Sequence, residues 1–224
     1  PNLIRLLGDN EIVFIDEAQR VENIGLSLKQ MHDNKSGCQL IVSGSSAFEL
    51  SNSINEPLTG RKWEYQIYPM SFSEMEAHTS WIDETRLLDT RLIFGSYPDV
   101  VNNPGNEVEI LKNLSGSYLY KDIFAFQDIR KPQLIERLLQ LLSFQVASEV
   151  SYNELAGKLQ VNARTVENYI DLLEKSYVIF RLPSFNRNLR NELKKSRKVY
   201  FYDNGIRNSI ISNFNSVKLR NDIG

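Results

Sequence analysis

Four apolar residues, Ile12 to Ile15, run directly into two adjacent carboxylates, Asp16 and Glu17. A short apolar run of this kind is typical of a buried, parallel strand. Carboxylates that end such a strand lie at the carboxyl edge of the sheet, where α/β proteins bind their ligands. The feature therefore predicts an α/β start with a candidate site after this strand. An ordinary strand that ends in a solvated acidic turn would have the same residues.

Strand and helix patterns alternate through the first 68 residues. A helical pattern follows the first strand and is carried by Ile24, Leu28 and Met31. An apolar run over 38–42 then breaks at Ser43-Gly44-Ser45-Ser46, and a third β-like segment over 63–68 ends at Pro69. Strands separated by helix-length segments indicate βαβ units and a parallel sheet.

Helical patterns dominate the rest of the chain. The sequence Ser71-x-x-Glu74 is a capping box that starts a helix, and a leucine-rich helix is expected after Pro132. We therefore expect an α/β fold followed by a mostly α part. The predicted parts are an α/β core over 1–75, a helical connector over 76–130, a winged helix-turn-helix over 131–190 and the start of an α+β C-terminal domain over 191–224.

The helix-turn-helix prediction rests on residues 151–182. Ser151-x-x-Glu154 is a second capping box, and Asn162 is a good N-cap after the short turn that begins at Gln160. A second helix over 163–175 and a β-prone run over 177–182 follow. Helix, tight turn, helix and then strands is the plan of a winged helix-turn-helix.

The composition of the chain argues against several kinds of binding site and partner. The 224 residues carry a net charge of -2, so any binding to nucleic acid needs a local basic patch. A lone cysteine, Cys38, suits a reducing compartment, and the separated His32 and His78 argue against a zinc site. Asp203 ends a late strand without a convincing set of further acids, so a structural role is preferred over a nuclease site. Because no apolar run approaches the roughly 20 residues of a membrane helix, we expect a cytoplasmic protein without a membrane partner.

Three further polar residues are candidates for the site at the sheet edge. Ser43 and Ser45 follow the strand that should neighbour the Asp16 strand, where a hydroxyl can sense a bound phosphate or the attacking water. Small residues in a tight turn would give the same pattern. Arg61 follows Gly60 in a turn and could offset transition-state charge, in its own subunit or in a neighbouring one. Most arginines in turns are merely solvated.

A nucleic-acid interface is predicted around the second helix of the helix-turn-helix. The candidates there are Asn162, Arg164, Thr165, Asn168 and Lys175, which suit base-edge or phosphate contacts. A basic segment beside the wing adds Arg187, Arg190, Lys194 and Lys195. Asp171 and Glu167 would repel phosphates, so a protein-binding module remains an alternative. A solvated hairpin loop that protects a sheet edge is the alternative reading of the basic segment.

Taken in order, these segments resemble a family of prokaryotic AAA+-type P-loop ATPases. In P-loop NTPases the apolar run followed by Asp16-Glu17 is the Walker B element. The matching phosphate loop, G-x-x-x-x-G-K-[ST], is missing, since Gly157-Lys158 is followed by Leu159. We therefore expect a fragment of a longer protein. The intact protein would bind ATP and Mg²⁺, whereas the fragment alone would bind ATP weakly or not at all.

The resemblance also implies roles for individual residues. Asp16 would hold Mg²⁺ through water, Glu17 would be the catalytic glutamate, and Ser43 or Ser45 would be the sensor-1 residue. Arg61 matches a Gly-Arg motif of related ATPases. The family continues into a C-terminal domain related in fold to restriction endonucleases.

Three functions remain open from the sequence. The first is ATP hydrolysis coupled to the winged helix. The second is a double-stranded-DNA-binding regulator in which the nucleotide is a switch. The third is a signalling or scaffold ATPase with a protein partner or self-association.

Overall fold

The computed structural model describes residues 10–34, 37–44, 58–118, 132–183, 197–220 and 222. The chain forms two compact units, Pro1–Gln66 (unit 1) and Ile67–Gly224 (unit 2). Each unit is described below by itself. As expected from the sequence, the fold is mixed: strands and a helix alternate in unit 1, and helices dominate unit 2.

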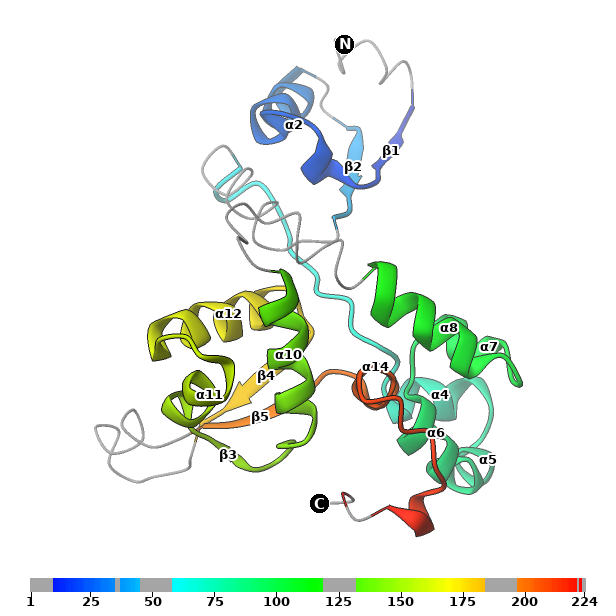
Figure 1. Cartoon of the computed structure of the whole chain (residues 1–224). Coiled ribbons are helices and arrows are strands. Elements are labelled where there is room, and N and C mark those ends of the chain that lie inside the picture. Colours follow the sequence, from blue (N-terminus) through cyan, green and yellow to red (C-terminus); the bar gives the residue numbers. More distant parts are fainter. Residues whose placement is uncertain are drawn as a thin grey trace, which may run out of the picture. The chain divides into compact units, whose positions relative to one another are not determined.

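Unit 1 contains a parallel pair of strands joined by a helix. Strands β1 (Ile12–Ile15) and β2 (Gln39–Val42) pair in parallel from Ile12–Gln39 to Ile15–Val42. Between them run the short 3₁₀ helix η1 (Ala18–Arg20) and helix α2 (Ile24–Asn34). Figure 1 shows α2 beside the two strands. The predicted β-α-β order of this segment is confirmed.

Only one face of this sheet is covered in the described structure. The buried helix residues Ile24, Leu28 and Met31 pack with alternate strand residues, which are Val13, Ile15, Leu40 and Val42. On the other face, Ile12 is 60% exposed and Phe14 is 61% exposed. The expectation of a fully buried strand is therefore wrong for β1. Its alternation buries every second residue, as in a sheet covered on one side.

The segment that leaves unit 1 is not a strand. Residues 62–68 form neither helix nor strand, although the sequence predicts a β-like segment over 63–68. Trp63, Tyr65 and Ile67 are 88%, 86% and 90% exposed. These large apolar residues alternate along the chain as in a strand, and their types favour strands. The described structure, however, provides no partner strand or covering layer for them. Propensity without burial does not make a strand.

The first part of unit 2 is a group of short helices. These are α4 (Phe72–His78), α5 (Trp81–Arg86), α6 (Leu88–Phe94), α7 (Pro98–Asn102), α8 (Glu107–Asn113) and the π-helical turn η2 (Leu114–Tyr118). The predicted capping box at α4 is present: Ser71 accepts from the backbone N–H of Glu74, and the Glu74 carboxylate accepts from that of Ser71. Val100 and Leu111 of this part form a small core with Ile206, which lies later in the chain.

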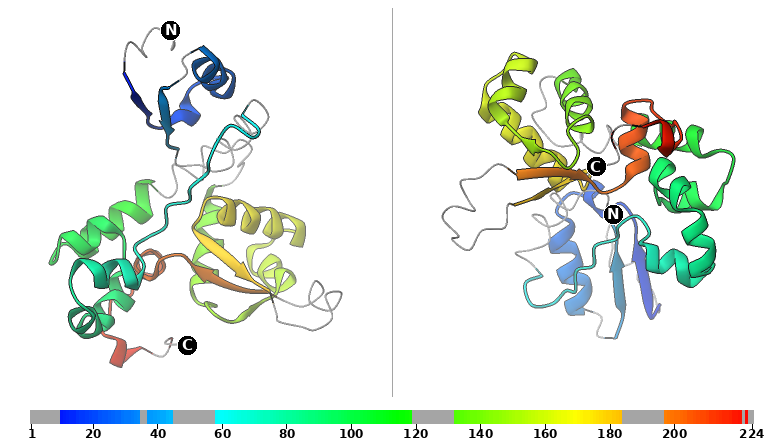
Figure 2. Two further views of the ribbon diagram at one scale, coloured as in Figure 1. Left: turned by 180° about the vertical axis from the view of Figure 1, so that it is seen from behind. Right: turned by 90° about the horizontal axis from the view of Figure 1, so that it is seen from below.

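The second part of unit 2 combines helices with an antiparallel sheet. Its elements are α10 (Pro132–Ser143), β3 (Glu149–Val150), α11 (Tyr152–Leu159), α12 (Ala163–Lys175), β4 (Ile179–Leu182), β5 (Arg197–Phe201), α14 (Asn204–Ile210) and the 3₁₀ helix η3 (Val217–Leu219). The strand order is β3-β5-β4. The right-hand view in Figure 2 shows α10, α11 and α12 on one face of this sheet. Buried apolar residues of these helices and of the sheet form the largest core of the described ranges.

The turn between α11 and α12 follows the sequence prediction. Gln160 ends α11 with a left-handed backbone (φ 56°), and α12 begins at Ala163. Asn162 caps α12, because its Oδ1 accepts from the backbone N–H of Thr165 at 2.7 Å. Helix α12 keeps its predicted bounds, with Val166, Ile170 and Leu173 buried as expected.

Strand β5 and helix α14 lie in the segment for which the sequence predicts a separate C-terminal domain. β5 pairs with both β3 and β4, and α14 contacts α6, α8 and α10. Figure 1 shows α14 between α10 and the helices of the first part. None of the helices in the described ranges is long and apolar enough to cross a membrane.

Candidate functional site

The ends of β1 and β2 bring two predicted site residues together. Asp16 follows β1 and Ser43 follows β2, and the Ser43 hydroxyl donates a hydrogen bond to Oδ1 of Asp16. The backbone fixes this edge further, because the N–H of Ser43 donates to the Ile15 carbonyl at 2.9 Å and the N–H of Ala18 donates to the Ser43 carbonyl at 3.0 Å. The parallel register therefore creates a carboxylate–hydroxyl pair at the carboxyl edge of the sheet.

Glu17 lies beside this pair in an unusual backbone conformation. Its φ of 51° and ψ of 42° are left-handed, which is uncommon for a residue with a long side chain. Such conformations cost on the order of 1–3 kcal/mol and cluster at functional sites. The Glu17 carboxylate forms an ion pair with Arg20 at 3.2 Å, with its side chain 40% exposed. The turn thus directs the chain from β1 into η1 and leaves the carboxylate accessible from solvent.

The donor set at this edge suits a magnesium ion that is shared with a phosphate. In the described ranges, no group of three or more His, Cys, Asp or Glu side chains gathers as a metal site. Mg²⁺, however, needs only one or two protein oxygens when phosphate and water supply the rest. The exposed Asp16 carboxylate and the adjacent Ser43 hydroxyl are oxygen donors of this kind.

Arg61 is not brought to this edge. Its Nη1 donates to Oδ1 of Asp33 at 2.8 Å, one residue before the end of α2. Because α2 returns the chain from the carboxyl end of β1 to the amino end of β2, Asp33 lies at the opposite edge of the sheet. An 11-residue helix is about 16 Å long. Ser45, the other predicted sensor residue, lies outside the described residues.

The predicted nucleic-acid residues divide into exposed side chains and helix caps. Arg164 and Asn168 are exposed on α12, and so is Lys175 at its C-terminal end. The Asn162 carbonyl oxygen instead accepts from both the N–H and the hydroxyl of Thr165, so these two side chains cap the helix. The candidates of the basic segment, Arg187, Arg190, Lys194 and Lys195, lie outside the described residues.

Sequence reasoning missed a basic partner for the acids of α12. Arg181, on β4, forms ion pairs with Asp171 at 2.7 Å and with Glu174, and its own side chain is only 13% exposed. Its Nη1 also donates to the Tyr152 hydroxyl at 3.3 Å. The negative charge of Asp171, on α12, is therefore partly neutralised by Arg181 on strand β4. The β-like pattern around Arg181 gave no sign that this arginine turns toward α12.

Asp203, which follows β5, has a structural role. It is 4% exposed and caps α14 by accepting from the N–H of Ile206 at 3.0 Å. Its other oxygen accepts from the N–H of Ser96 at 2.7 Å. Burial raises the pKa of this carboxyl, and these backbone hydrogen bonds oppose the shift. The sequence-based preference for a structural carboxylate over a nuclease acid agrees with this geometry.

Comparison with protein families divides the chain in a similar way. A model of an AAA domain matches residues 2–76, which include β1, α2 and β2. A model of a domain of unknown function, DUF8612, matches residues 85–217, more than half of the chain. The first match supports a nucleotide-binding, ATPase-type domain at the start of the chain.

Relatives with similar sequences are uncharacterized proteins. One from Methanocaldococcus jannaschii is 27% identical over 192 residues, which cover 78% of this chain and 43% of the relative. One from Haemophilus influenzae is 26% identical over 214 residues, covering 90% and 51%. One from Mycobacterium tuberculosis is 23% identical over 208 residues, covering 91% and 45%. The chain thus spans about half the length of the curated relatives that it matches. It belongs to the DUF8612 family of unknown function and carries an AAA-like domain before the DUF8612 region.

Proposed function

We propose that unit 1 is the Walker B half of a P-loop ATPase core, and that the longer protein binds and hydrolyses ATP with Mg²⁺. The observation that carries this proposal is the Asp16–Ser43 pair at the adjacent carboxyl ends of β1 and β2. The match of the surrounding residues to an AAA domain supports it independently.

The side chains divide the chemistry between them. Asp16 would hold Mg²⁺ through water, and Ser43 would orient Asp16 or contact the γ-phosphate. Mg²⁺ supplies charge neutralisation at the phosphates when it is bound. Glu17 would orient the attacking water and accept its proton. The two adjacent carboxylates have different partners, since Glu17 pairs with Arg20 and Asp16 accepts from Ser43, and this supports different roles for them.

The position of Arg61 supports a role away from its own sheet edge. Asp33 holds its guanidinium near the C-terminal end of α2, about a helix length from Asp16. We therefore propose that Arg61 acts on a nucleotide bound by a neighbouring copy. A structural role of the Arg61–Asp33 pair is the alternative.

ATP turnover by the longer protein tests the proposal. We expect Glu17→Gln to lower the turnover rate about 100-fold or more, the usual size of a lost general base. Asp16→Asn should also lower the rate, because it weakens the binding of Mg²⁺. Glu22→Gln, an exposed carboxylate of the same unit, is the matched control and should keep the wild-type rate. Wild-type turnover in either site variant would reject the assignment.

A second candidate function is binding of double-stranded DNA by α12. The order α10, β3, α11, α12, β4 and β5, with β5 between β3 and β4, supports the winged helix that the sequence predicts. The observation that favours DNA is the pairing of Asp171 and Glu174 with Arg181, which reduces the negative charge beside the exposed Arg164 and Asn168.

Fluorescence anisotropy of a labelled duplex at several salt concentrations tests this candidate with the chain as it stands. Binding should weaken with a log–log slope of about -0.9 per phosphate neutralised. Arg164→Glu should abolish it, whereas Arg137→Glu, an exposed arginine of α10, should not. An absence of binding at low salt would instead favour α12 as a protein-docking face, as in a signalling or scaffold ATPase.

A further inference from the structure

The chain passes from an exposed segment into a packed corner of unit 2. Trp63 and Tyr65 are exposed almost completely. Three residues later, the ring of Tyr68 stacks on Tyr202 with 5.2 Å between ring centroids and an interplanar angle of 18°. It also meets Tyr177 edge-on at 6.2 Å. Tyr68 is 50% exposed, so one side of its ring remains open to solvent. Aromatic pairs of this kind contribute about 0.5–1.5 kcal/mol beyond the area they bury, and these ring contacts tie the incoming segment to Tyr177 and Tyr202.

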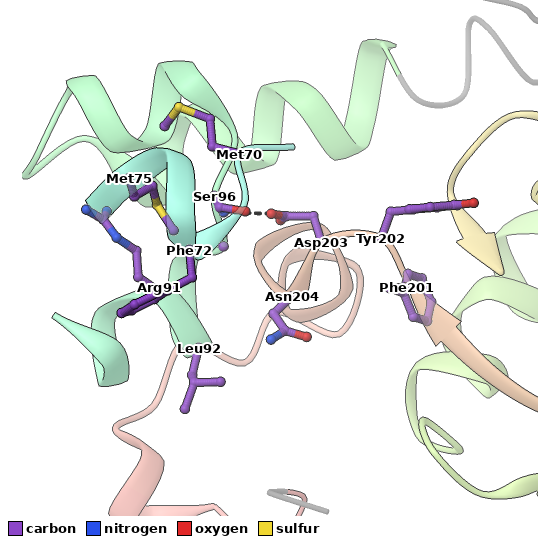
Figure 3. Close-up of a pocket in the computed structure, with 11 residues that line it drawn as sticks. Met70, Phe72, Met75, Arg91, Leu92, Ser96, Phe201, Tyr202, Asp203 and Asn204 are labelled. Carbon is purple, nitrogen blue, oxygen red and sulfur yellow. Dashed lines mark hydrogen bonds between the residues drawn. The ribbon is translucent and has the colours of Figure 1, made fainter. Parts of the chain in front are cut away.

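A relay of hydrogen bonds fixes the backbone of the same corner. The N–H of Met70 donates to the Ser96 carbonyl at 2.9 Å. The N–H of Ser96 donates to Oδ2 of Asp203 at 2.7 Å, the contact that Figure 3 shows as a dashed line. Oδ1 of Asp203 caps α14. The incoming segment is therefore joined to the first turn of α14 through one buried carboxylate.

The two turns that meet at this carboxylate interlock without room for side chains. Gly95 has a φ of 75°, and a Cβ there would overlap the carboxylate of Asp203. A Cβ on Gly205 would overlap the carbonyl group of Phe94. The Gly95–Ser96 turn and the start of α14 are therefore closely packed, and the Ser96–Asp203 hydrogen bond links them. We expect a displacement of the turn to shift the start of α14.

Helix α14 links the Ser96–Asp203 corner to helix α10, which precedes α11 and α12. The Asn208 amide donates to the carbonyl groups of Leu92 and Ile93, at 3.1 and 2.7 Å, at the end of α6. Nε of Arg207, which is 5% exposed, donates to the carbonyl of Ser143 at 2.8 Å, at the end of α10. Helix α14 thus holds the ends of α6 and α10 through neighbouring residues.

We propose that the corner made by Tyr68–Met70, Gly95–Ser96 and Tyr202–Asp203 is a mechanical joint. It passes a displacement of the segment that leaves unit 1 to α14, and through α14 to α10 and the helix-turn-helix. A pocket of about 250 Å³ lies beside the corner and is lined by Met70, Phe72 and Met75, among others. Figure 3 shows these side chains next to the Ser96–Asp203 contact. Flexible methionine side chains can repack as the corner shifts.

Hydrogen exchange of the chain without nucleotide tests whether Tyr68 holds the joint. Tyr68→Ala should speed exchange at the amides of Met70 and Ser96 about tenfold, because it removes the stacking on Tyr202. Tyr65→Ala removes an 86% exposed ring from the preceding segment and should leave both amides unchanged. Tyr68→Phe keeps the ring but removes the hydroxyl that hydrogen-bonds Tyr202, so its effect should be smaller than that of Tyr68→Ala. Unchanged exchange in Tyr68→Ala, or an equal effect of Tyr65→Ala, would overturn the joint.

The transmission step rests on the proposed ATPase function and needs the longer protein. Mg²⁺ and ATP should change amide exchange in α10 to α12 of the wild type and of Tyr65→Ala. In Tyr68→Ala, the nucleotide-dependent change in amide exchange should be at least fivefold smaller than in the wild type, while the nucleotide affinity stays the same. A full nucleotide-dependent change in Tyr68→Ala would overturn the transmission. A protein that binds no nucleotide would overturn the proposed function instead, and the nucleotide-free exchange would still decide on the joint.

Discussion

The described parts of units 1 and 2 differ in how much of their apolar surface is buried. Unit 1 carries the proposed site residues, Asp16, Glu17 and Ser43, directly after strands β1 and β2, and leaves Ile12 and Phe14 of its sheet largely exposed. Unit 2 has a large core, in which buried residues of α10, α11, α12 and the sheet pack together. Buried polar groups of unit 2 such as Asp203 and Asn208 make hydrogen bonds that hold turns and helix ends. The proposed site thus lies on a sheet with one face covered in the described ranges, whereas the described part of unit 2 has the larger core.

The largest expected effect comes from opening the core of unit 2. Leu139 is fully buried in α10, and Leu139→Ala should lower the free energy of unfolding by about 2–5 kcal/mol. Leu88→Ala removes a leucine that is 46% exposed in the same unit and should cost under about 0.5 kcal/mol. Urea unfolding followed by circular dichroism measures both. Equal losses of unfolding free energy in the two variants would show that burial does not determine the cost of removing these leucines.

The buried ion pair of unit 2 should come next. Glu84 is fully buried and accepts two hydrogen bonds from Arg91, both at 2.9 Å. Glu84→Gln should cost about 3 kcal/mol at neutral pH, because it leaves a charge that is mostly buried without its partner. Asp89→Asn, which changes an exposed carboxylate of α6, serves as the control and should have little effect. Urea unfolding of the two variants measures the difference.

The pH dependence of this pair has a definite sign. The hydrogen bond from Arg91, opposed by burial, holds the pKa of Glu84 below its ordinary value of 4.5. Its stabilising contribution is therefore complete above pH 4.5 and is lost as the pH falls through the lowered pKa. The difference in unfolding free energy between wild type and Glu84→Gln should shrink over that acidic range. A difference that grows in acid would contradict this assignment.

A smaller effect is expected from the cap of α12. Asn162→Ala removes the acceptor for the Thr165 N–H and should cost about 1 kcal/mol. Asn162→Asp keeps an acceptor at the helix N-terminus and should cost less. Thermal unfolding of the three proteins measures the difference. If the alanine and aspartate variants lose the same stability, the cap is not what Asn162 contributes.

The smallest effect should come from the Arg61–Asp33 pair in unit 1. Both side chains are more than two-fifths exposed, at 42% and 46%, and such pairs are worth about 0–1 kcal/mol. Asp33→Asn should therefore hardly change the unfolding of the chain. In the longer protein, a loss of ATP turnover in Asp33→Asn without a loss of stability would favour a functional Arg61 over a structural one.

Local patterns were enough to predict much of the fold. The apolar run before Asp16 predicted β1, and the Asn162 cap with helical spacing predicted the bounds of α12. These features depend on neighbours within a few residues. The segment 63–68 misled because Trp63 and Tyr65 have strand propensity, yet burial by a partner decides whether such residues form a strand.

The candidate site was only partly readable from the sequence. Asp16 and Ser43 could be paired in advance, since parallel strands bring their carboxyl ends to one edge. The contact between Ser96 and Asp203 joins residues 107 positions apart, and no local pattern announces it. The approach of Arg181 to Asp171 depends in the same way on how the sheet packs against α12.

The most direct test of the proposed ATPase is to measure binding and hydrolysis of ATP on one sample of the longer protein that carries Glu17→Gln. Asp16 holds the metal and Glu17 acts on water in our proposal. The variant should therefore bind ATP with Mg²⁺ within about threefold of the wild-type affinity, yet hydrolyse it about 100-fold more slowly. Hydrolysis at the wild-type rate by the Glu17→Gln protein would contradict the proposal.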